Sequence, residues 1–319
     1  MKKFDGHIGI DFGGTKIEGI VLKTGFDSAA NLDDFIIFRE RIDTEAKLGY
    51  DHLVDKLSKF INRIIQKMKL NSDHTTIGIG LPGSIMRKSG LVKNSNTTCL
   101  NNKPFWNDVQ KRLKIPIVFE NDANCFALAE AVWGAGKMHR LVIGVILGTG
   151  VGGGIIFDKQ IVSGLQNIAG EWGHAILIPD SRPCYCGKQG CIETYLSGSA
   201  FQKFELKDNN FNISSQKFCI DWENGLYTAN PAAESAINQY CNHFGMAVSN
   251  LINILDPDAV ILGGGMSNAS FLYSTGIAYI KKFVFNDELL TPVKKAILGD
   301  SAGVFGAAYL GFTSNGIRL

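Results

Sequence analysis

Five of the eight residues in the segment 147–154 are glycines, and short apolar runs rich in β-branched residues precede and follow it. Residues 141–146 and 155–157 therefore favour two strands joined by a glycine turn. With no side chains in the way, backbone N–H groups in such a turn can hold an anion, most often a phosphate. The segment alone is equally compatible with a tight hairpin whose glycines serve positive φ angles.

A second segment near the start of the chain has the same plan. Residues 8–22 contain an apolar run that reaches Asp11, a turn with the sequence Gly13-Gly14-Thr15-Lys16, and a second apolar run. Two hairpins of one plan predict two related α/β halves that face a single ligand. A nucleoside triphosphate held from both sides fits that arrangement chemically.

Between and after the two hairpins, strand-like and helix-like patterns alternate. Apolar residues recur at three- and four-residue spacings over residues 53–68, which predicts a helix covering one face of a sheet. Further strands are expected at 35–41, 76–81, 115–119 and 259–262, and further helices at 123–132, 231–252 and 304–312. The alternation predicts an α/β fold, and the opening hairpin predicts mixed sheets. Residues 205–230 are polar and give no clear pattern.

Two glycine patterns literally match the dinucleotide fingerprint G-x-G-x-x-G: Gly148-x-Gly150-x-x-Gly153 and Gly78-x-Gly80-x-x-Gly83. The fingerprint requires a helix directly after the turn. Residues 155–157 favour a strand instead, and Pro82 interrupts the second match. A nicotinamide-dependent enzyme is therefore disfavoured.

The composition limits location and partners. The 319 residues are 45% hydrophobic and 19% charged, which is typical of a soluble protein large enough for two domains. A net charge of +2 gives no indication of a nucleic-acid surface. No apolar run approaches the ~18 residues of a membrane span, and Asp5 and Asp11 interrupt the segment that resembles a signal peptide. We therefore expect a cytoplasmic protein with no nucleic-acid or membrane partner.

The strongest local pattern is one histidine with three cysteines: His174, Cys184, Cys186 and Cys191. The spacing His-x9-Cys-x-Cys-x4-Cys supplies one imidazole and three thiolates, which fill a closed tetrahedral zinc site. Because no coordination position stays open, we expect Zn²⁺ with a structural role. The alternative is a set of free cytosolic thiols. The other four cysteines are scattered, and the odd total of seven argues against a disulfide framework.

Two glutamates belong to the same loop. Glu171 stands three residues before His174, and Glu193 follows Cys191 by two residues. A metal-bound loop would hold both carboxylates rigidly, and ionised carboxylates accept strongly from the hydroxyl groups of a sugar. Either glutamate alone would fit a solvated surface charge, but their place in a metal loop favours a binding site.

The pair Asn121-Asp122 stands where a predicted strand meets a predicted helix. Asp122 can cap this helix, which is the commoner role for such a residue. Strand-to-helix corners also line clefts in α/β folds, where a carboxylate can take the proton from a hydroxyl that attacks phosphorus. Asp11, at the end of the first strand, is the expected partner for Mg²⁺ on a bound triphosphate.

Together these motifs resemble the ROK family (repressors, open reading frames and sugar kinases) of the actin/hexokinase-like superfamily. The resemblance runs from residues 8–16 to residues 263–267. Its most specific parts are Glu171-Trp172-Gly173-His174 and residues 184–193, which look like the family's zinc and sugar-loop signatures. It implies two ribonuclease H-like lobes with mixed sheets and a cleft between them. The expected lobes are residues 1–121 plus 302–319, and residues 122–301.

The resemblance also implies roles for single residues. Asp122 looks like the catalytic base. The matches to sugar-binding positions are Asn121, Glu171, His174 (which would bind both sugar and zinc) and Glu193, with weaker contacts at Gly83 and Asn96. The matches to the ATP-binding loops are Asp11, Gly13, Gly14, Thr15 and Lys16; Gly148, Thr149, Gly150 and Gly152; and, for adenosine, Gly263, Gly264 and Gly265.

Family members close two lobes over the sugar and pair as homodimers, so we expect both here. The catalytic residues are intact, and no room before residue 8 is left for the repressors' DNA-binding domain, which favours the kinase branch. Residues 90–98, 100–105 and 183–191 are most similar to bacterial fructokinases, so we expect ATP-dependent phosphorylation of the 6-hydroxyl of fructose. N-acetylglucosamine kinases, which share residues 121–128, are the close alternative, followed by kinases of other hexoses or N-acetylhexosamines. A non-catalytic sugar sensor is the alternative of another class.

Overall fold

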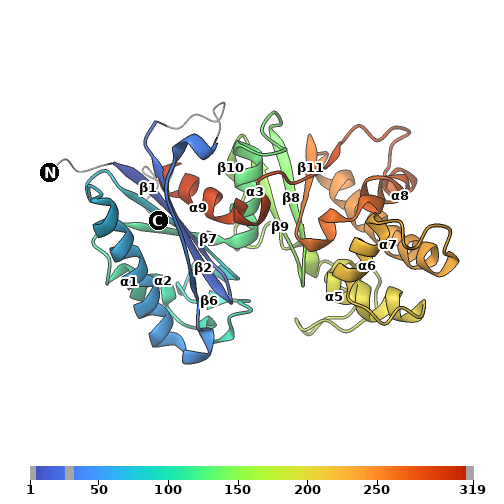
Figure 1. Ribbon diagram of the computed structural model, residues 1–319, viewed down its shortest axis with the longest axis horizontal. Helices are drawn as coiled ribbons and strands as arrows, with labels where there is room; N and C mark the ends of the chain where they lie inside the picture. Colours follow the sequence, from blue (N-terminus) through green and yellow to red (C-terminus); the bar gives the residue numbers. More distant parts are fainter. Residues whose placement is uncertain (1–4, 26–31, 314–319) are drawn as a thin grey trace. The chain divides into compact units, whose positions relative to one another are not determined.

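The structure is a computed structural model that describes residues 5–25 and 32–313 (Figure 1). These residues form two compact units, which are described in turn. Unit 1 comprises the chain up to Lys137, the segment Lys159–Ala169 and the residues from Leu298 onward. Unit 2 comprises Met138–Asp158 and Gly170–Ile297. No described helix is long and apolar enough to cross a membrane.

Unit 1 is built on a mixed sheet with the strand order β3-β2-β1-β4-β7. β2 pairs antiparallel with both β1 and β3, whereas β4 is parallel to β1 and β7 is parallel to β4. The strands are β1 (Gly6–Phe12), β2 (Lys16–Lys23), β3 (Ile36–Asp43), β4 (Thr76–Leu81) and β7 (Ile117–Asn121). Short strands of this unit are β5 (Ser84–Ile85), β6 (Val92–Lys93) and β10 (Gln160–Ile161). The mixed sheet expected from the opening hairpin is confirmed.

Helices cover both faces of this sheet. They are α1 (Tyr50–Met68), α2 (Phe105–Gln110), α3 (Asp122–Val132) and α9 (Ala302–Thr313). α1 and α2 lie on one face, where Leu57 of α1 shares a hydrophobic core with Ile8 of β1. α3 and α9 pack together on the other face (Figure 1). The amphipathic helix predicted over residues 53–68 is confirmed as α1.

A very close contact joins α3 to α9. Gly306 of α9 lies so near α3 that a Cβ on it would be 1.8 Å from the carbonyl oxygen of Cys125. The sequence analysis assigns residues 122–301 to the C-terminal lobe, whereas the structure groups α3, the segment Lys159–Ala169 and the residues from Leu298 with unit 1. α3 belongs with unit 1 because it packs closely on α9, which comes from the far end of the chain.

The sheet of unit 2 repeats the plan of unit 1. β8 (Leu141–Leu147) pairs antiparallel with β9 (Val151–Phe157) and parallel with β11 (Ala259–Gly263). β11 in turn pairs parallel with β12 (Val293–Lys295). The hairpin β8-β9 therefore corresponds to β1-β2, and β11 corresponds to β4. The two related α/β halves predicted from the repeated hairpin are confirmed.

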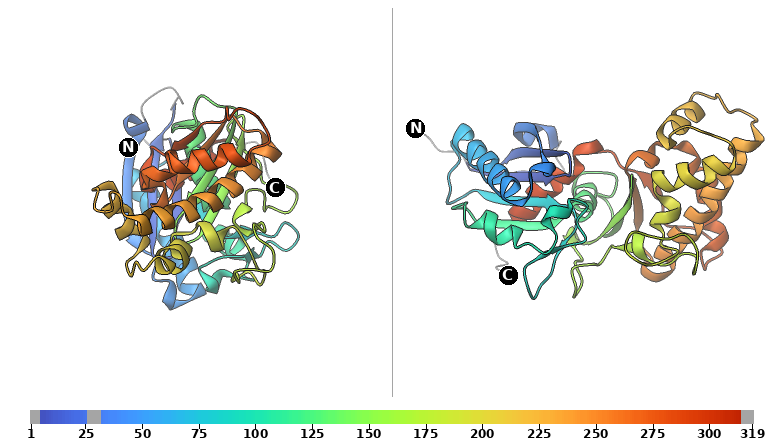
Figure 2. Two further views of the ribbon diagram at one scale, coloured as in Figure 1. Left: turned by 90° about the vertical axis from the view of Figure 1, so that its right-hand side faces the viewer. Right: turned by 90° about the horizontal axis from the view of Figure 1, so that it is seen from below.

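Unit 2 has a thick helical layer. Its helices are α4 (Glu193–Leu196), α5 (Gly198–Phe201), α6 (Ser215–Glu223), α7 (Pro231–Leu255) and α8 (Thr275–Phe283), and a π-helical turn, η5 (Gln202–Leu206), follows α5. α7 and α8 run side by side (Figure 2, left). Asn230 caps α7 by accepting the N–H of Ala232 at 3.0 Å, and Pro231 occupies the first position, as predicted. The unpatterned residues 205–230 contain α6 and an aromatic cluster in which Phe218 stacks on Tyr227.

We expect Gly78→Ala in β4 to destabilise unit 1 strongly, because a Cβ there would stand 1.8 Å from the carbonyl oxygen of Ala307 in α9. A backbone carbonyl cannot change rotamer to avoid the clash as a side chain can. The free energy of unfolding should therefore fall by about 3 kcal/mol, the upper end of the range for overpacked sites. Denaturant unfolding followed by circular dichroism measures this loss. Gly80→Ala in the same strand is the control, since the atom nearest to its Cβ would be the Cys125 Sγ, at 3.2 Å. Equal losses in the two variants would contradict this explanation.

Candidate functional site

In unit 1, the carboxylates predicted to act on phosphate stand at one edge of the sheet. β1, β4 and β7 run in parallel, and the pairs Asp11↔Gly80 and Leu81↔Asn121 align their carboxyl ends. Asp11 therefore lies at the same edge as the start of α3. Ligands of open α/β sheets bind outside this edge.

Asn121, rather than Asp122, caps α3. The Asn121 Oδ1 atom accepts hydrogen bonds from the N–H groups of Ala123 (2.9 Å) and Asn124 (3.3 Å). Its Nδ2 atom donates to the carbonyl oxygen of Gly83 at 3.0 Å. Asp122 occupies the first position of α3, where its Oδ1 atom accepts the N–H of Ala123 at 2.9 Å. The N-cap role considered for Asp122 therefore belongs to Asn121.

Gly83 and Asn96, the two positions expected to make weaker sugar contacts, lie in different surroundings. Gly83 has φ +90°, and a Cβ on it would lie 2.5 Å from the carbonyl oxygen of Lys93, so the turn itself requires glycine. Asn96 is exposed. The Asn101 side chain holds the backbone N–H and carbonyl of the preceding Ser95, both at 2.9 Å. Asn96 therefore projects to solvent from a braced loop.

Asp11 lies in a buried and negatively charged environment. Burial, together with the charges of Asp122 and Glu18, raises the pKa of the Asp11 carboxyl from 3.8 to about 7, although Arg41 opposes the shift. Gly303 in the first turn of α9 packs against this carboxyl group, since a Cβ there would be 3.2 Å from Oδ2. A divalent cation would favour the ionised form of such a carboxyl, which suits the role expected with Mg²⁺.

Glu120 is a half-buried residue of this corner that no sequence motif marks. Burial raises the pKa of its carboxyl. Its Oε1 atom accepts from the N–H of Asn121 (2.8 Å) and from Nδ2 of Asn124 (3.0 Å), and its Oε2 atom accepts from the Ser163 hydroxyl (3.4 Å). Glu120 therefore braces the corner from which Asp122 projects. Its place directly before Asn121 is the one signal the sequence offers.

The first predicted phosphate loop is an open turn. The N–H of Gly13 donates to the carbonyl of Lys16 at 2.9 Å, and the Thr44 hydroxyl donates to the carbonyl of Gly13 at 2.7 Å. Gly14, Thr15 and Lys16 are exposed. Neither Gly13 nor Gly14 adopts a positive φ, so these glycines leave access to the backbone rather than serve the turn geometry.

The second predicted phosphate loop is the turn between β8 and β9 in unit 2. The N–H of Gly148 donates to the carbonyl of Gly150 at 2.9 Å, and the carbonyl of Gly148 accepts the N–H of Gly198 at 2.7 Å. Thr149 between them is exposed. Neither turn glycine adopts a positive φ, so the alternative of a hairpin that needs positive φ angles is wrong.

The predicted adenosine loop lies beside this turn. Gly263 ends β11 and pairs with Ile146 of β8. Gly264 has φ +80°, and a Cβ on it would lie 2.5 Å from the carbonyl oxygen of Leu147. Gly265 is exposed, with open space where a Cβ would stand. The parallel pair β8 and β11 therefore brings the two glycine segments together.

Gly152, by contrast, lies in β9 and not in the turn. Its carbonyl oxygen accepts a hydrogen bond from Trp172 Nε1 at 2.8 Å. The next residue, Gly153, has no room for a Cβ, which would be 2.7 Å from the Trp172 ring. Gly153 lets Trp172 lie across the strand, a packing role that the sequence does not distinguish from a phosphate loop. The ATP-binding role expected for Gly152 stays a prediction.

Glu193 links the predicted sugar loop to the second turn. Its Oε2 atom accepts the N–H of Val151 at 2.9 Å. A Cβ on Gly150 would stand 2.6 Å from the same oxygen, so the carboxylate takes the space that a side chain would need. A carboxylate expected to bind sugar and a turn expected to bind phosphate are therefore in direct contact within one unit.

The four predicted metal ligands are gathered in one place. The ligand atoms of His174, Cys184, Cys186 and Cys191 all lie within 4.8 Å of one another. Cys184 Sγ is 3.7 Å from His174 Nδ1, and Cys186 Sγ is 3.6 Å from Cys191 Sγ. Zn–S and Zn–N bonds of about 2.3 and 2.0 Å give tetrahedral edges of roughly 3.5–3.8 Å, so this group fits a zinc ion. Four protein ligands would leave it a structural role only.

The two nitrogens of His174 face different partners. Nδ1 faces Cys184, and Nε2 lies 3.1 Å from the Tyr185 hydroxyl. A metal-bound histidine is commonly fixed by a partner on its other nitrogen. A sugar contact by His174 would therefore occur at Nε2, beside Tyr185. Glu171 is half-buried and directly precedes the 3-10 turn η4 (Trp172–His174).

Comparison with known proteins finds a matching family and several relatives in sequence. The model of the ROK family matches residues 7–313. An N-acetyl-D-glucosamine kinase of Haemophilus influenzae is 33% identical over 318 residues, which cover 96% of this chain and 99% of the relative. The N-acetylgalactosamine kinase AgaK of a Shewanella species is 33% identical over 313 residues, which cover 96% of each chain.

Solved structures share the fold. The ROK hexokinase from Thermus thermophilus has a TM-score of 0.81 at 24% identity, covering 97% of this chain and 98% of that chain. A ROK family glucokinase from Streptomyces griseus, in complex with glucose and AMPPNP, has a TM-score of 0.76 at 26% identity, covering 97% and 99%. The predicted α/β fold with a mixed sheet in each of two lobes is confirmed.

We expect Cys186→Ser to release bound metal. Cys186 is exposed, so the change removes a ligand without disturbing the core. Wild-type protein should carry about one zinc per chain and the variant far less, with a lower melting temperature because the loop loses its cross-link. Elemental analysis and thermal melting measure the two effects. Cys99→Ser, outside the cluster, should keep the metal, and folded wild-type protein that is free of metal would contradict the assignment.

We expect Asp11→Asn to become stabilising, relative to wild type, as the pH rises. The folded-state pKa of about 7 lies above the ordinary 3.8, so between these values the folded protein holds a proton that the unfolded chain has released. Wild-type stability is therefore lost as the pH rises through this window, by roughly 1.4 kcal/mol per unit of pKa difference. Asparagine carries no such charge.

Urea unfolding at pH 5 and pH 8.5, without nucleotide or Mg²⁺, tests this expectation. The difference in unfolding free energy between Asp11→Asn and wild type should shift in favour of the variant at the higher pH. Asp158→Asn, an exposed carboxylate that pairs with Arg140, is the control. A difference for Asp11→Asn that does not change with pH would show that Asp11 ionises normally.

Proposed function

Because this chain belongs to the ROK family, we propose that it is an ATP-dependent sugar kinase whose preferred substrate is an N-acetylhexosamine, N-acetylglucosamine first. The relatives named above as kinases of N-acetylglucosamine and N-acetylgalactosamine match this chain over nearly its whole length. The preference for fructose in the sequence analysis has no support among them, so fructose becomes the alternative substrate. The hydroxyl proposed to be phosphorylated is the 6-hydroxyl.

The observation that carries this proposal is the contact of Glu193 with the second glycine turn. The Glu193 carboxylate accepts the N–H of Val151 at 2.9 Å, directly after Gly150. Phosphoryl transfer requires that the sugar and the phosphates of ATP be held next to each other. A sugar-binding carboxylate attached to a phosphate-binding turn provides that proximity.

Asp122 is the proposed general base. It projects from the first position of α3, at the sheet edge that also carries Asp11. There it would accept the proton of the attacking hydroxyl, help that is typically worth about 10²–10⁴ in rate. Asn121 and Glu120 hold the corner of backbone from which Asp122 projects. Gly83 and Asn96 are proposed as further sugar contacts.

The two glycine turns are proposed to bind the phosphates through exposed backbone N–H groups, with Lys16 adding a positive charge. Asp11 would hold Mg²⁺, which neutralises the charge of the phosphates. Gly263, Gly264 and Gly265 are proposed as the adenosine loop, in which Gly265 has open space where a Cβ would stand.

Asn121, Glu171, His174 and Glu193 are proposed to bind the sugar, and the two carboxylates would accept hydrogen bonds from its hydroxyls. The zinc ion proposed for His174 and the three cysteines supplies a cross-link that keeps this loop in one conformation. The homodimer expected from the family resemblance stays a prediction.

We expect ATP-dependent ADP release with N-acetylglucosamine to show the highest kcat/KM in a panel that also contains N-acetylgalactosamine, N-acetylmannosamine, glucose, mannose and fructose. A coupled ADP-release assay with Mg²⁺ measures it. A higher kcat/KM with fructose would restore the fructokinase prediction. ADP release with none of the sugars would leave a sugar sensor as the better explanation.

In the same assay, Asp122→Asn should lower kcat about a hundredfold or more while sugar affinity changes little, because the base is lost but the shape is kept. Asp158→Asn, exposed on unit 2 and paired with Arg140, is the matched control and should leave turnover unchanged. Near-normal turnover in Asp122→Asn would remove this residue from the role.

A further inference from the structure

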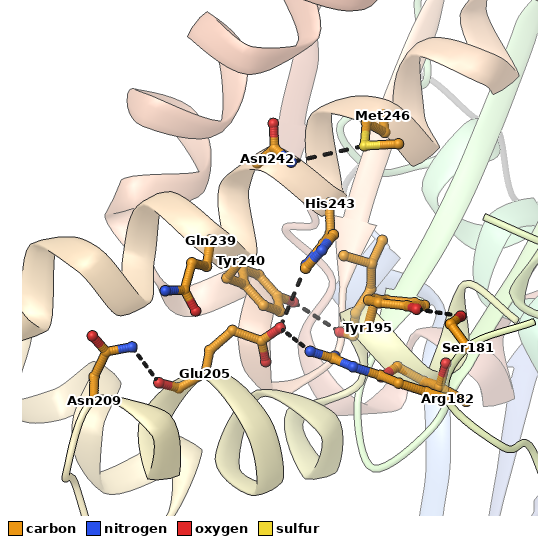
Figure 3. A network of polar contacts seen from close by, with 12 residues as sticks. Ser181, Arg182, Tyr195, Glu205, Asn209, Gln239, Tyr240, Asn242, His243 and Met246 are labelled. Carbon is orange, nitrogen blue, oxygen red and sulfur yellow. Dashed lines mark hydrogen bonds and ion pairs between the residues drawn. The ribbon is translucent and has the colours of Figure 1, made fainter. Parts of the chain in front are cut away.

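A buried carboxylate in unit 2 has no part in the chemistry proposed above. Glu205 lies in the π-helical turn η5, and its side chain is 1% exposed. Its Oε1 atom accepts a hydrogen bond from Arg182 Nη2 at 3.0 Å, and His243 Nδ1 is 3.4 Å from the same oxygen (Figure 3). Its Oε2 atom is buried and has no hydrogen-bond partner among the described residues. A buried charge is costly unless it is paired, so Glu205 depends on Arg182.

The Arg182 guanidinium is held by two aromatic rings and two hydrogen bonds. Its Cζ atom lies 4.3 Å from the ring centre of Tyr195 and 3.8 Å from that of Phe204, so two aromatic rings enclose it. Its Nη1 atom donates to the carbonyl oxygen of Thr194 at 3.0 Å, while Nη2 donates to Glu205. Lysine cannot reproduce such a set, because it lacks both the planar face and the fork of donors.

These contacts tie together three segments that matter for the sugar loop. Arg182 is separated from the metal ligand Cys184 by one residue, and its own carbonyl accepts the N–H of Gly190 at 2.8 Å. Thr194 directly follows Glu193, whose carboxylate accepts the N–H of Val151 at 2.9 Å. The guanidinium therefore fixes the backbone beside the carboxylate that links sugar loop and glycine turn.

Stabilisation of the fold does not by itself explain the ion pair between Arg182 and Glu205. Buried ion pairs can often be replaced by apolar residues of similar volume with no loss, because desolvation of both charges offsets their attraction. Here one carboxylate oxygen also lacks a partner among the described residues, which adds to the cost. The π-helical turn that carries Glu205 is a further local irregularity, of a kind found frequently at functional sites.

We propose that Arg182 and Glu205 are positioning residues for the sugar: Glu205 orients the Arg182 guanidinium, which fixes the backbone at Thr194 and thereby the direction of the Glu193 carboxylate. This inference rests on the proposed function, because it takes Glu193 as a sugar-binding group. It adds a pair of residues that touch no substrate and act through Glu193.

The first test is Arg182→Lys, assayed with N-acetylglucosamine and ATP varied separately. The KM for the sugar should rise about tenfold or more, since small misplacements of binding groups are costly, and it should rise more than the KM for ATP. Zinc content should stay at the wild-type level. Arg140→Lys, in an exposed ion pair of the same unit, is the control and should leave both KM values unchanged. An unchanged sugar KM in folded Arg182→Lys would overturn the proposal.

A second set of variants separates positioning from stability. Arg182→Met leaves Glu205 buried without its cation, and should lower both the melting temperature and the sugar affinity. Adding Glu205→Leu removes the remaining charge and should restore the melting temperature, while the sugar KM stays raised. A double variant that regains the wild-type sugar KM as well would show that the pair serves stability only.

Calorimetric titration of N-acetylglucosamine into wild type and Arg182→Lys distinguishes the two proposals. Weaker sugar binding in the variant, with no ADP release by wild type, would support positioning and overturn the kinase. ADP release by wild type with equal sugar Kd and KM in the variant would overturn positioning and leave the kinase standing. Neither binding nor ADP release by wild type would overturn both.

Discussion

The hydrogen bond from the N–H of Val151 to the Glu193 carboxylate, at 2.9 Å, is the contact that joins the proposed sugar and phosphate sites of unit 2. It exists because Gly150 has no Cβ, which would stand 2.6 Å from the same carboxylate oxygen. The turn must therefore be glycine for a reason that lies 43 residues further along the chain, at Glu193. Any side chain at position 150 would displace either the turn or the carboxylate, and so would separate the proposed phosphate and sugar sites.

The glycines of this chain look alike in sequence but serve different physical purposes. Gly83 and Gly264 have positive φ, Gly78 lies against the backbone of α9, and Gly153 makes room for the Trp172 ring. A Cβ on Gly148 would meet no atom nearer than 3.9 Å, so packing alone does not require glycine there. A glycine motif read along the chain cannot separate these cases, because each is decided by what packs against the glycine from elsewhere.

This limit explains what could and could not be predicted. The strands, the helix α1 and the mixed sheets follow from local spacing, and the structure places them as expected. The four predicted metal ligands are likewise found together. The placement of α3 with unit 1 does not, because it is decided by α9 at the far end of the chain. Glu120 and Arg182 could not be picked out for the same reason, since a lone charge in a sequence gives no sign of the groups that surround it in the fold. The choice between N-acetylglucosamine and fructose depends on placements of a fraction of an ångström, which residue types do not encode.

Glu193 is restrained through the residues before and after it in the chain and through its own carboxylate. Cys191, two residues before it, is one of the four predicted metal ligands, and the carbonyl of Thr194, the residue after it, accepts a hydrogen bond from Arg182 at 3.0 Å. The carboxylate itself is held by Val151. A segment fixed at three points has lost its conformational freedom during folding, so a sugar that binds there does not have to order it and retains more of its contact energy as affinity. Removing one restraint should therefore weaken sugar binding before it unfolds the protein, because the other two still hold the loop.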